Sequence, residues 1–180
     1  MSADVPEAIR DKYVTEAVES GVETIDGETV GHVCFLDLDE TSLGAARDVA
    51  SRLPGSVAIL RSSSRSYHIW GLAIKPLDAW LDLAISLDAV DDEHVSLSDR
   101  RGCGVLRIDA KRDAVSGELV KRAPTVIGIE TTSSRLPHSE PHVRLLRGLT
   151  SDPIEIPAGI DLVGERLSRR VYMAEIGGRR

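Results

Sequence analysis

The sequence predicts an α+β domain whose core, at about residues 30–112, has the element order β-α-β-β-α-β. Three observations lead to this order. Apolar runs of strand length are rich in strand-forming residues. They alternate with stretches whose apolar residues recur at helical spacing. A short polar link joins the second run to the third, which favours an antiparallel hairpin. The 180 residues are expected to form a single domain (1–180), with a C-terminal extension at residues 113–180.

Local signals define the first half of the core. Residues 1–20 are expected to form a helix, and Asp26-Gly27 marks a turn before the first core strand at residues 30–38. A helix is predicted from Ser42, a favourable N-cap, to residue 53, because its apolar residues lie on one stripe. Pro54-Gly55 then ends this helix.

The second half of the core contains the hairpin. Its strands are expected within residues 56–74, on either side of the polar link 62–66. Pro76 begins a second helix with a broad apolar face, and a short helix at about residues 92–99 leads to the strand that ends at Asp109. This order is that of the split βαβ, RRM-like sandwich, in which the first and third strands are neighbours.

The extension is expected to add strands and a helix to this core. The strands are predicted at residues 126–129 and 171–176, and the helix at residues 139–149. His138 and His142, near the start of that helix, are expected at the surface.

Two carboxylates stand at the end of the first core strand. Asp37 and Asp39 are two residues apart, so a strand directs both side chains to the same face. Such a pair is costly unless a cation neutralises it. Oxygen-only ligands of this kind suit Mg²⁺ or Mn²⁺. A divalent ion on paired aspartates is typical of chemistry on phosphates.

Two further segments carry polar residues at strand spacing. Ser66 and His68 are two residues apart near the start of the second hairpin strand, so they are expected on one face. The last core strand ends at Asp109, and Arg107 and Lys111 flank it on the same side of the sheet. These two cations would place positive charge on that side of the sheet.

Together the three segments have the pattern hhhDhD, SxH and hD, where h is an apolar residue. In this order the pattern resembles the catalytic core of the archaeo-eukaryotic primase superfamily, over about residues 30–112. The resemblance implies that the catalytic and metal-binding residues are Asp37, Asp39 and Asp109. It implies that the nucleotide-binding residues are Ser66, His68, Arg107 and Lys111.

The same resemblance implies an activity. It predicts a template-directed nucleotidyltransferase, a DNA primase or primase-polymerase, that uses Mg²⁺ or Mn²⁺ to join nucleoside triphosphates on single-stranded DNA during DNA replication. No zinc-binding stem or large helical accessory domain is evident in the sequence. A minimal core of this kind is therefore expected to work with a second primase subunit or a helicase.

Two alternatives remain open. The segment Asp37 to Thr41 also matches the DxDxT motif of haloacid-dehalogenase-type phosphatases, with Asp37 as nucleophile and Asp39 as general acid/base. That fold needs long parallel crossovers, whereas a link of five residues after the second strand favours a hairpin. A catalytically degenerate RRM-like nucleic-acid-binding module is the other alternative. The missing hairpin glycine favours the module, and the three carboxylates argue against it.

The composition bears on partners and compartment. A net charge of −7 is unusual for a nucleic-acid binder. However, 18 Arg against 4 Lys with dispersed acids is halophile-like, and high salt screens charge steering. Cys34 and Cys103 fall in predicted strands and indicate neither a zinc site nor a disulfide framework. Since no apolar run reaches about 18 residues, a cytoplasmic protein without a membrane partner is expected.

Overall fold

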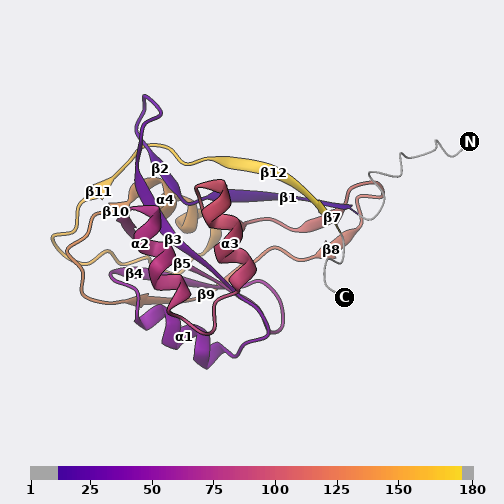
Figure 1. The fold of residues 1–180 in the computed structure, drawn as a ribbon, viewed down its shortest axis with the longest axis horizontal. Coiled ribbons are helices and arrows are strands. Elements are labelled where there is room, and N and C mark those ends of the chain that lie inside the picture. The colour runs from indigo at the N-terminus through magenta and orange to yellow at the C-terminus, as the bar shows by residue number, and fades with distance from the viewer. Residues whose placement is uncertain (1–11, 176–180) are drawn as a thin grey trace, which may run out of the picture.

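The computed structural model describes residues 12–175, which form an α+β fold of two sheets and four helices (Figure 1). The predicted α+β class is therefore confirmed. The helices are α1 (Leu43–Ser51), α2 (Leu77–Ile85), α3 (Asp92–Arg101) and α4 (Glu140–Leu149).

The two sheets differ in size. The larger sheet contains seven strands: β2 (Gly21–Glu23), β3 (Thr29–Leu38), β4 (Ser56–Arg61), β5 (Tyr67–Lys75), β9 (Thr125–Thr131), β10 (His138–Ser139) and β11 (Leu162–Val163). The smaller sheet contains five: β1 (Lys12–Glu19), β6 (Val105–Arg107), β7 (Lys111–Asp113), β8 (Leu119–Lys121) and β12 (Arg169–Glu175). Strand pairing within the described residues is antiparallel, except between β10 and β11.

The hairpin at the centre of the larger sheet is confirmed. β5 pairs with β4 on one side and with β3 on the other, and eight of its nine residues are buried. The N–H groups of Ser62 and Ser63 donate to the carbonyl of Ser66 and close the link between β4 and β5. The register places Asp37 of β3 opposite His68 of β5, so the two side chains project from the same face.

Different layers cover the two faces of this sheet. α1 and α2 pack on one face through Val49 and Trp80, together with Leu53, which follows α1. α4 and the smaller sheet pack on the other face, where Leu146 and Leu106 belong to a second core cluster. Strands that are buried on both faces need apolar residues at successive positions, which explains the continuous apolar runs of β4 and β5.

The N-terminal prediction is wrong where the structure describes it. Residues 12–19 form strand β1 and not the end of a helix, while residues 1–11 of that prediction lie outside the described residues. β1 pairs with β12 from Lys12 to Val18, and also with β6 and β7. These partners are distant in sequence, so the local pattern of Lys12–Glu19 gave no sign of them.

The fourth core strand lies in the second sheet. β6 ends at Arg107, two residues before the predicted end, and it pairs with β1. The free edge of β3 is occupied by β2, with Gly21 opposite His32. The smaller sheet therefore faces the end of β3 where Asp37 stands, and it brings the residues of β6 and β7 to that end.

The extension forms a strand at β9, helix α4 and strand β12, close to the predicted positions. The surface prediction for two histidines is wrong, because His138 and His142 are both fully buried. Nε2 of His138 accepts the N–H of Ser56 at 3.0 Å. Nε2–H of His142 donates to the carbonyl of Glu19 at 2.9 Å, and burial lowers its pKa to about 4. Both rings are neutral hydrogen-bonding parts of the core.

His142→Ala is expected to lower the free energy of unfolding by about 2–4 kcal/mol, because it opens a cavity and leaves the Glu19 carbonyl without its donor. Urea unfolding followed by circular dichroism measures this. Arg144→Ala, on the exposed side of the same helix, is the control and should change stability by less than about 0.5 kcal/mol. Equal effects of the two substitutions would contradict the structural role of the buried ring.

None of the helices within residues 12–175 has the length and apolarity that a membrane crossing requires.

Candidate active site

An open cavity of about 420 Å³ lies where the two sheets and α3 meet. In Figure 1 the smaller sheet extends as an arm beside the larger sheet, and α3 lies near the base of that arm. The cavity is lined by β1, β6, β7 and β8 from the smaller sheet, and by β3 and β5 from the larger one. Its carboxylates include Asp37, Asp39 and Asp91, and its cations include Arg107, Lys111 and Lys121.

Three carboxylates form a compact acidic group in this cavity. One carboxylate oxygen from each of Asp37, Asp39 and Asp91 lies within 4.8 Å of the others. Asp37 stands near the end of β3, and Asp39 follows it just beyond the strand. Asp91 is the N-cap of α3, and its side chain accepts the N–H of Glu93 at 3.1 Å. Its own N–H donates to the carbonyl of Asp37 at 2.8 Å, which joins the start of α3 to the end of β3.

The crowding of these carboxylates changes their proton affinity. Burial, the charge of Asp39 and the charge of Asp91 raise the pKa of Asp37 to about 7. Oδ1 of Asp37 is buried without a hydrogen-bond partner among the described residues. The raised pKa of Asp37 means that its carboxyl keeps its proton to a higher pH than an ordinary aspartate does. A bound cation would favour its ionised form.

His68 faces Asp37 as a neutral imidazole. Its side chain is buried, and Nε2 lies 3.7 Å from Oδ1 of Asp37. Burial and the charge of Arg107 hold the pKa of His68 well below its usual value, so this contact is not an ion pair at neutral pH. Nδ1 of His68 and the hydroxyl of Ser62 are buried in the same lining without a partner among the described residues. Buried polar atoms of this kind are rare in folded proteins.

The smaller sheet supplies the positive charge. The guanidinium of Arg107 is buried and donates to three carbonyls, those of Asp109, Arg122 and Ser62. These bonds fix its position without neutralising its charge. Nζ of Lys111 lies over the ring of Tyr13, 4.1 Å from its centroid.

Lys121 on β8 adds a third cation to this side of the cavity. Burial and the charges of Arg107 and Lys111 lower the pKa of Lys121, as expected where like charges crowd together. Within residues 12–175, no salt bridge engages Arg107, Lys111 or Lys121. This arrangement of cations is suited to binding an anion.

The structure brings together most of the residues that the sequence singled out. Five of the seven line the cavity: Asp37, Asp39, His68, Arg107 and Lys111. Ser66 does not line it. This residue lies in the hairpin link before β5 begins, so strand alternation does not align it with His68, and its carbonyl closes the turn instead.

Asp109 also lies outside the lining of the cavity and outside the acidic group. It is exposed, and its carboxylate accepts the N–H of Ala110 at 2.6 Å. The part of Asp109 that serves the cavity is its backbone carbonyl, which accepts from Arg107 at 2.7 Å and from the hydroxyl of Thr15 at 3.2 Å. Since β6 ends at Arg107, no strand directs the Asp109 side chain toward β3.

The polar residues of the lining that sequence reasoning missed include Ser62, Asp91 and Lys121. Asp91 was identifiable as a helix N-cap, but its closeness to Asp37 depends on how α3 packs. No local pattern marked Lys121, although lysine is scarce in this chain, with only 4 residues.

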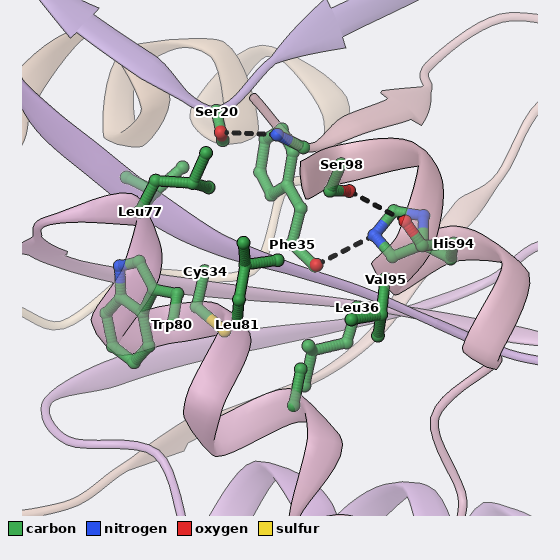
Figure 2. Close-up of a pocket in the computed structure, with 13 residues that line it drawn as sticks. Ser20, Cys34, Phe35, Leu36, Leu77, Trp80, Leu81, His94, Val95 and Ser98 are labelled. Carbon is green, nitrogen blue, oxygen red and sulfur yellow. Dashed lines mark hydrogen bonds between the residues drawn. The ribbon is translucent and has the colours of Figure 1, made fainter. Parts of the chain in front are cut away.

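α3 is fixed to β3 at a second point by His94. Figure 2 shows the His94 ring turned toward the carbonyl of Phe35, to which Nε2–H donates at 2.9 Å. The hydroxyl of Ser98 donates to the carbonyl of His94 at 2.8 Å. The cavity of about 20 Å³ between α2, α3 and β3 has room for about one water molecule. His94 therefore positions α3, and this small cavity is no candidate for a nucleotide site.

Comparison with protein-family models, with curated proteins and with solved structures finds no match for this chain. The chemistry of the cavity is therefore inferred from its residues. It combines a compact group of carboxylates with a neutral histidine and three cations that no salt bridge engages within the described residues.

Proposed function

We propose that the protein is a metal-dependent, template-directed nucleotidyltransferase of the primase type, which joins nucleoside triphosphates on single-stranded DNA. One observation carries this proposal: paired carboxylates and three cations line the same cavity. Aspartates that hold a divalent ion, next to cations that hold phosphate oxygens, are the recurring parts of phosphoryl and nucleotidyl transfer.

The acidic residues fit a divalent ion of the Mg²⁺ or Mn²⁺ type. Asp37 and Asp39 offer oxygen ligands only, and the buried Oδ1 of Asp37 has no partner among the described residues. When bound, such an ion would polarise the α-phosphate and bring the attacking 3′-hydroxyl of the primer close to it. The bond from the 3′-oxygen to the α-phosphate would replace the bond to the β-phosphate, so that pyrophosphate leaves and the hydroxyl proton passes to solvent. Asp37 must first release the proton that burial favours.

The remaining residues would bind and orient the triphosphate. Arg107, held by three carbonyls, meets phosphate oxygens in a fixed position, and Lys111 and Lys121 add charge beside it. Neutral His68 and the hydroxyl of Ser62 have unused hydrogen-bonding capacity in the same lining. No protein nucleophile is needed, because positioning and charge neutralisation lower the barrier.

The proposal extends to the scaffold and to the partners. β3, α1, β4, β5 and α2 would be the first five elements of an RRM-like core, and β6 would be the sixth, displaced into the smaller sheet. A single-stranded template, a second primase subunit or helicase, and a cytoplasmic location remain predictions of the sequence.

The phosphatase alternative is disfavoured, because β3, β5 and β4 are antiparallel, whereas its fold requires parallel strands.

Binding of a deoxynucleoside triphosphate in the presence of Mn²⁺ tests the proposed site. Lys121→Ala is expected to weaken this binding by about 10–100-fold, the range for losing one charge-assisted hydrogen bond in a partly buried site. Isothermal titration calorimetry at fixed salt measures the affinity.

Arg122→Ala is the matched control. It removes the same charge at the next residue, which is exposed and does not line the cavity. Binding to this variant should remain within about threefold of the wild type, since screened surface charges contribute little. Equal losses in the two variants would show that general attraction, and not the cavity, holds the nucleotide.

A further inference from the structure

We infer that Asp91, and not Asp109, supplies the third carboxylate for the divalent ion. This inference rests on the proposed function and specifies its metal site. The carboxylate of Asp91 lies within 4.8 Å of those of Asp37 and Asp39, whereas Asp109 is exposed and belongs to neither the acidic group nor the lining of the cavity. The ion would then join the end of β3 to the first turn of α3.

A second observation indicates that a ligand belongs at this place. His68 and Ser62 are each about 95% buried, yet Nδ1 of His68 and the hydroxyl of Ser62 have no partner among the described residues. Both residues line the cavity that contains the acidic group. Such groups are normally satisfied by protein, water or a bound ligand. The His68 ring faces the acidic group, because its Nε2 lies 3.7 Å from Oδ1 of Asp37.

The local structure prepares Asp91 for this role. The N-cap position fixes its backbone, since its N–H donates to the Asp37 carbonyl at 2.8 Å. His94, one turn later, donates to the Phe35 carbonyl of the same strand. α3 therefore cannot shift along β3 without breaking two hydrogen bonds.

The capping bond of Asp91 is compatible with metal coordination. The N–H of Glu93 donates to Oδ1 of Asp91, and a carboxylate has a second oxygen that coordinates an ion while the first accepts this bond. A capping carboxylate is thus held at a defined angle, which is what a hard cation with strict geometry requires.

The hydrogen bonds of Asp109 are structural and do not involve the acidic group. Its backbone carbonyl accepts from Arg107, and its side chain accepts from Ala110 in its own turn. Asparagine preserves the backbone contact, so removing the charge of Asp109 should leave the cavity unchanged. The two aspartates therefore make a matched pair, in which each substitution to asparagine removes one negative charge.

The test is Mn²⁺ binding to the full chain, without nucleotide or DNA, measured by electron paramagnetic resonance at fixed salt. Asp91→Asn is expected to weaken Mn²⁺ binding at least about tenfold, as loss of a coordinating group does. Asp109→Asn should bind within about twofold of the wild type, because an exposed charge outside the site is screened. Asparagine is also as good an N-cap as aspartate, so α3 should keep its start.

Thermal unfolding in EDTA checks that both variants are folded. If Asp91→Asn is unfolded, Asp91→Ser removes the carboxylate and retains a capping oxygen, with the same expected loss. Weakened binding by Asp109→Asn with unchanged binding by Asp91→Asn would overturn the inference and leave the proposed function standing. Unchanged binding in both variants would overturn it as well. Failure of the wild type to bind Mn²⁺ would overturn the proposed function together with the inference.

Discussion

Asp39→Asn is expected to reduce nucleotide incorporation about 10²–10³-fold while leaving the protein folded. Asp39 is exposed just beyond the end of β3, so its carboxylate contributes to the acidic group and little to packing. Its amide replacement keeps the shape of the side chain but removes a charged ligand of the proposed ion. The initial rate of primer extension on single-stranded DNA, at several Mn²⁺ concentrations, measures the loss.

Glu40→Gln is the control for this prediction. Glu40 is the next residue and exposed, and its carboxylate pairs with Arg65 at 3.4 Å outside the cavity. The variant should retain the wild-type rate within about twofold, because an exposed ion pair contributes little. If Glu40→Gln loses as much activity as Asp39→Asn, or if neither loses any, the acidic group is not the catalytic metal site.

The raised pKa of Asp37 makes the stability of the metal-free protein depend on pH. Burial and the neighbouring carboxylates raise the pKa of Asp37 to about 7, whereas an aspartate in the unfolded chain titrates near 4. Between these values the native state holds a proton that the unfolded state has released. The contribution of Asp37 to stability therefore falls as pH rises from about 4 to about 7, and above that window the penalty is fully present.

Asp37→Asn removes this penalty. Without metal at about pH 8, the variant is expected to be more stable than the wild type by about 2–4 kcal/mol, a range that allows for the partial exposure of the side chain. At about pH 4.5 the two proteins should differ little, since Asp37 is then protonated in the native state. Urea unfolding in EDTA at both pH values measures the difference, and the stabilised variant should be inactive.

Buried histidines change the pH dependence in the opposite direction. The pKa values of His68 and His142 are lowered, so each makes stability fall as pH drops below about 6.5. Both proteins contain these histidines, so most of this contribution cancels when the stability of Asp37→Asn is compared with that of the wild type. Asp109→Asn controls for general removal of a negative charge and should shift stability by less than about 0.5 kcal/mol. A destabilised Asp37→Asn at pH 8 would contradict the crowding of the three carboxylates.

Local sequence patterns predicted the centre of the larger sheet. The apolar runs of β3, β4 and β5, the short link and the Ser42 N-cap are all local signals, and the structure contains each of them. The expected adjacency of the first and third core strands is confirmed, with Asp37 opposite His68. This part of the site was predictable because strand alternation and hairpin register depend on neighbouring residues.

The rest of the site depends on contacts between distant segments. β1 pairs with β12 across almost the whole described chain, and this pairing builds the sheet that carries Arg107 and Lys111. The burial of His142 likewise depends on a carbonyl 123 residues away. Periodicity reports which face of an element is buried, but not what buries it. The sequence therefore indicated that Asp91 lies at the start of a helix and that Asp109 lies close to a strand end, but not how far either is from Asp37.

Template-directed incorporation by the wild-type protein tests the central claim most directly. A primed single strand is supplied at high salt with Mn²⁺ and one deoxynucleoside triphosphate at a time, and the extended product is resolved by electrophoresis. The account predicts extension only with the nucleotide complementary to the template base, and none in EDTA. Release of phosphate from simple phosphate esters, without extension on any template and with the same loss in Asp39→Asn, would contradict it.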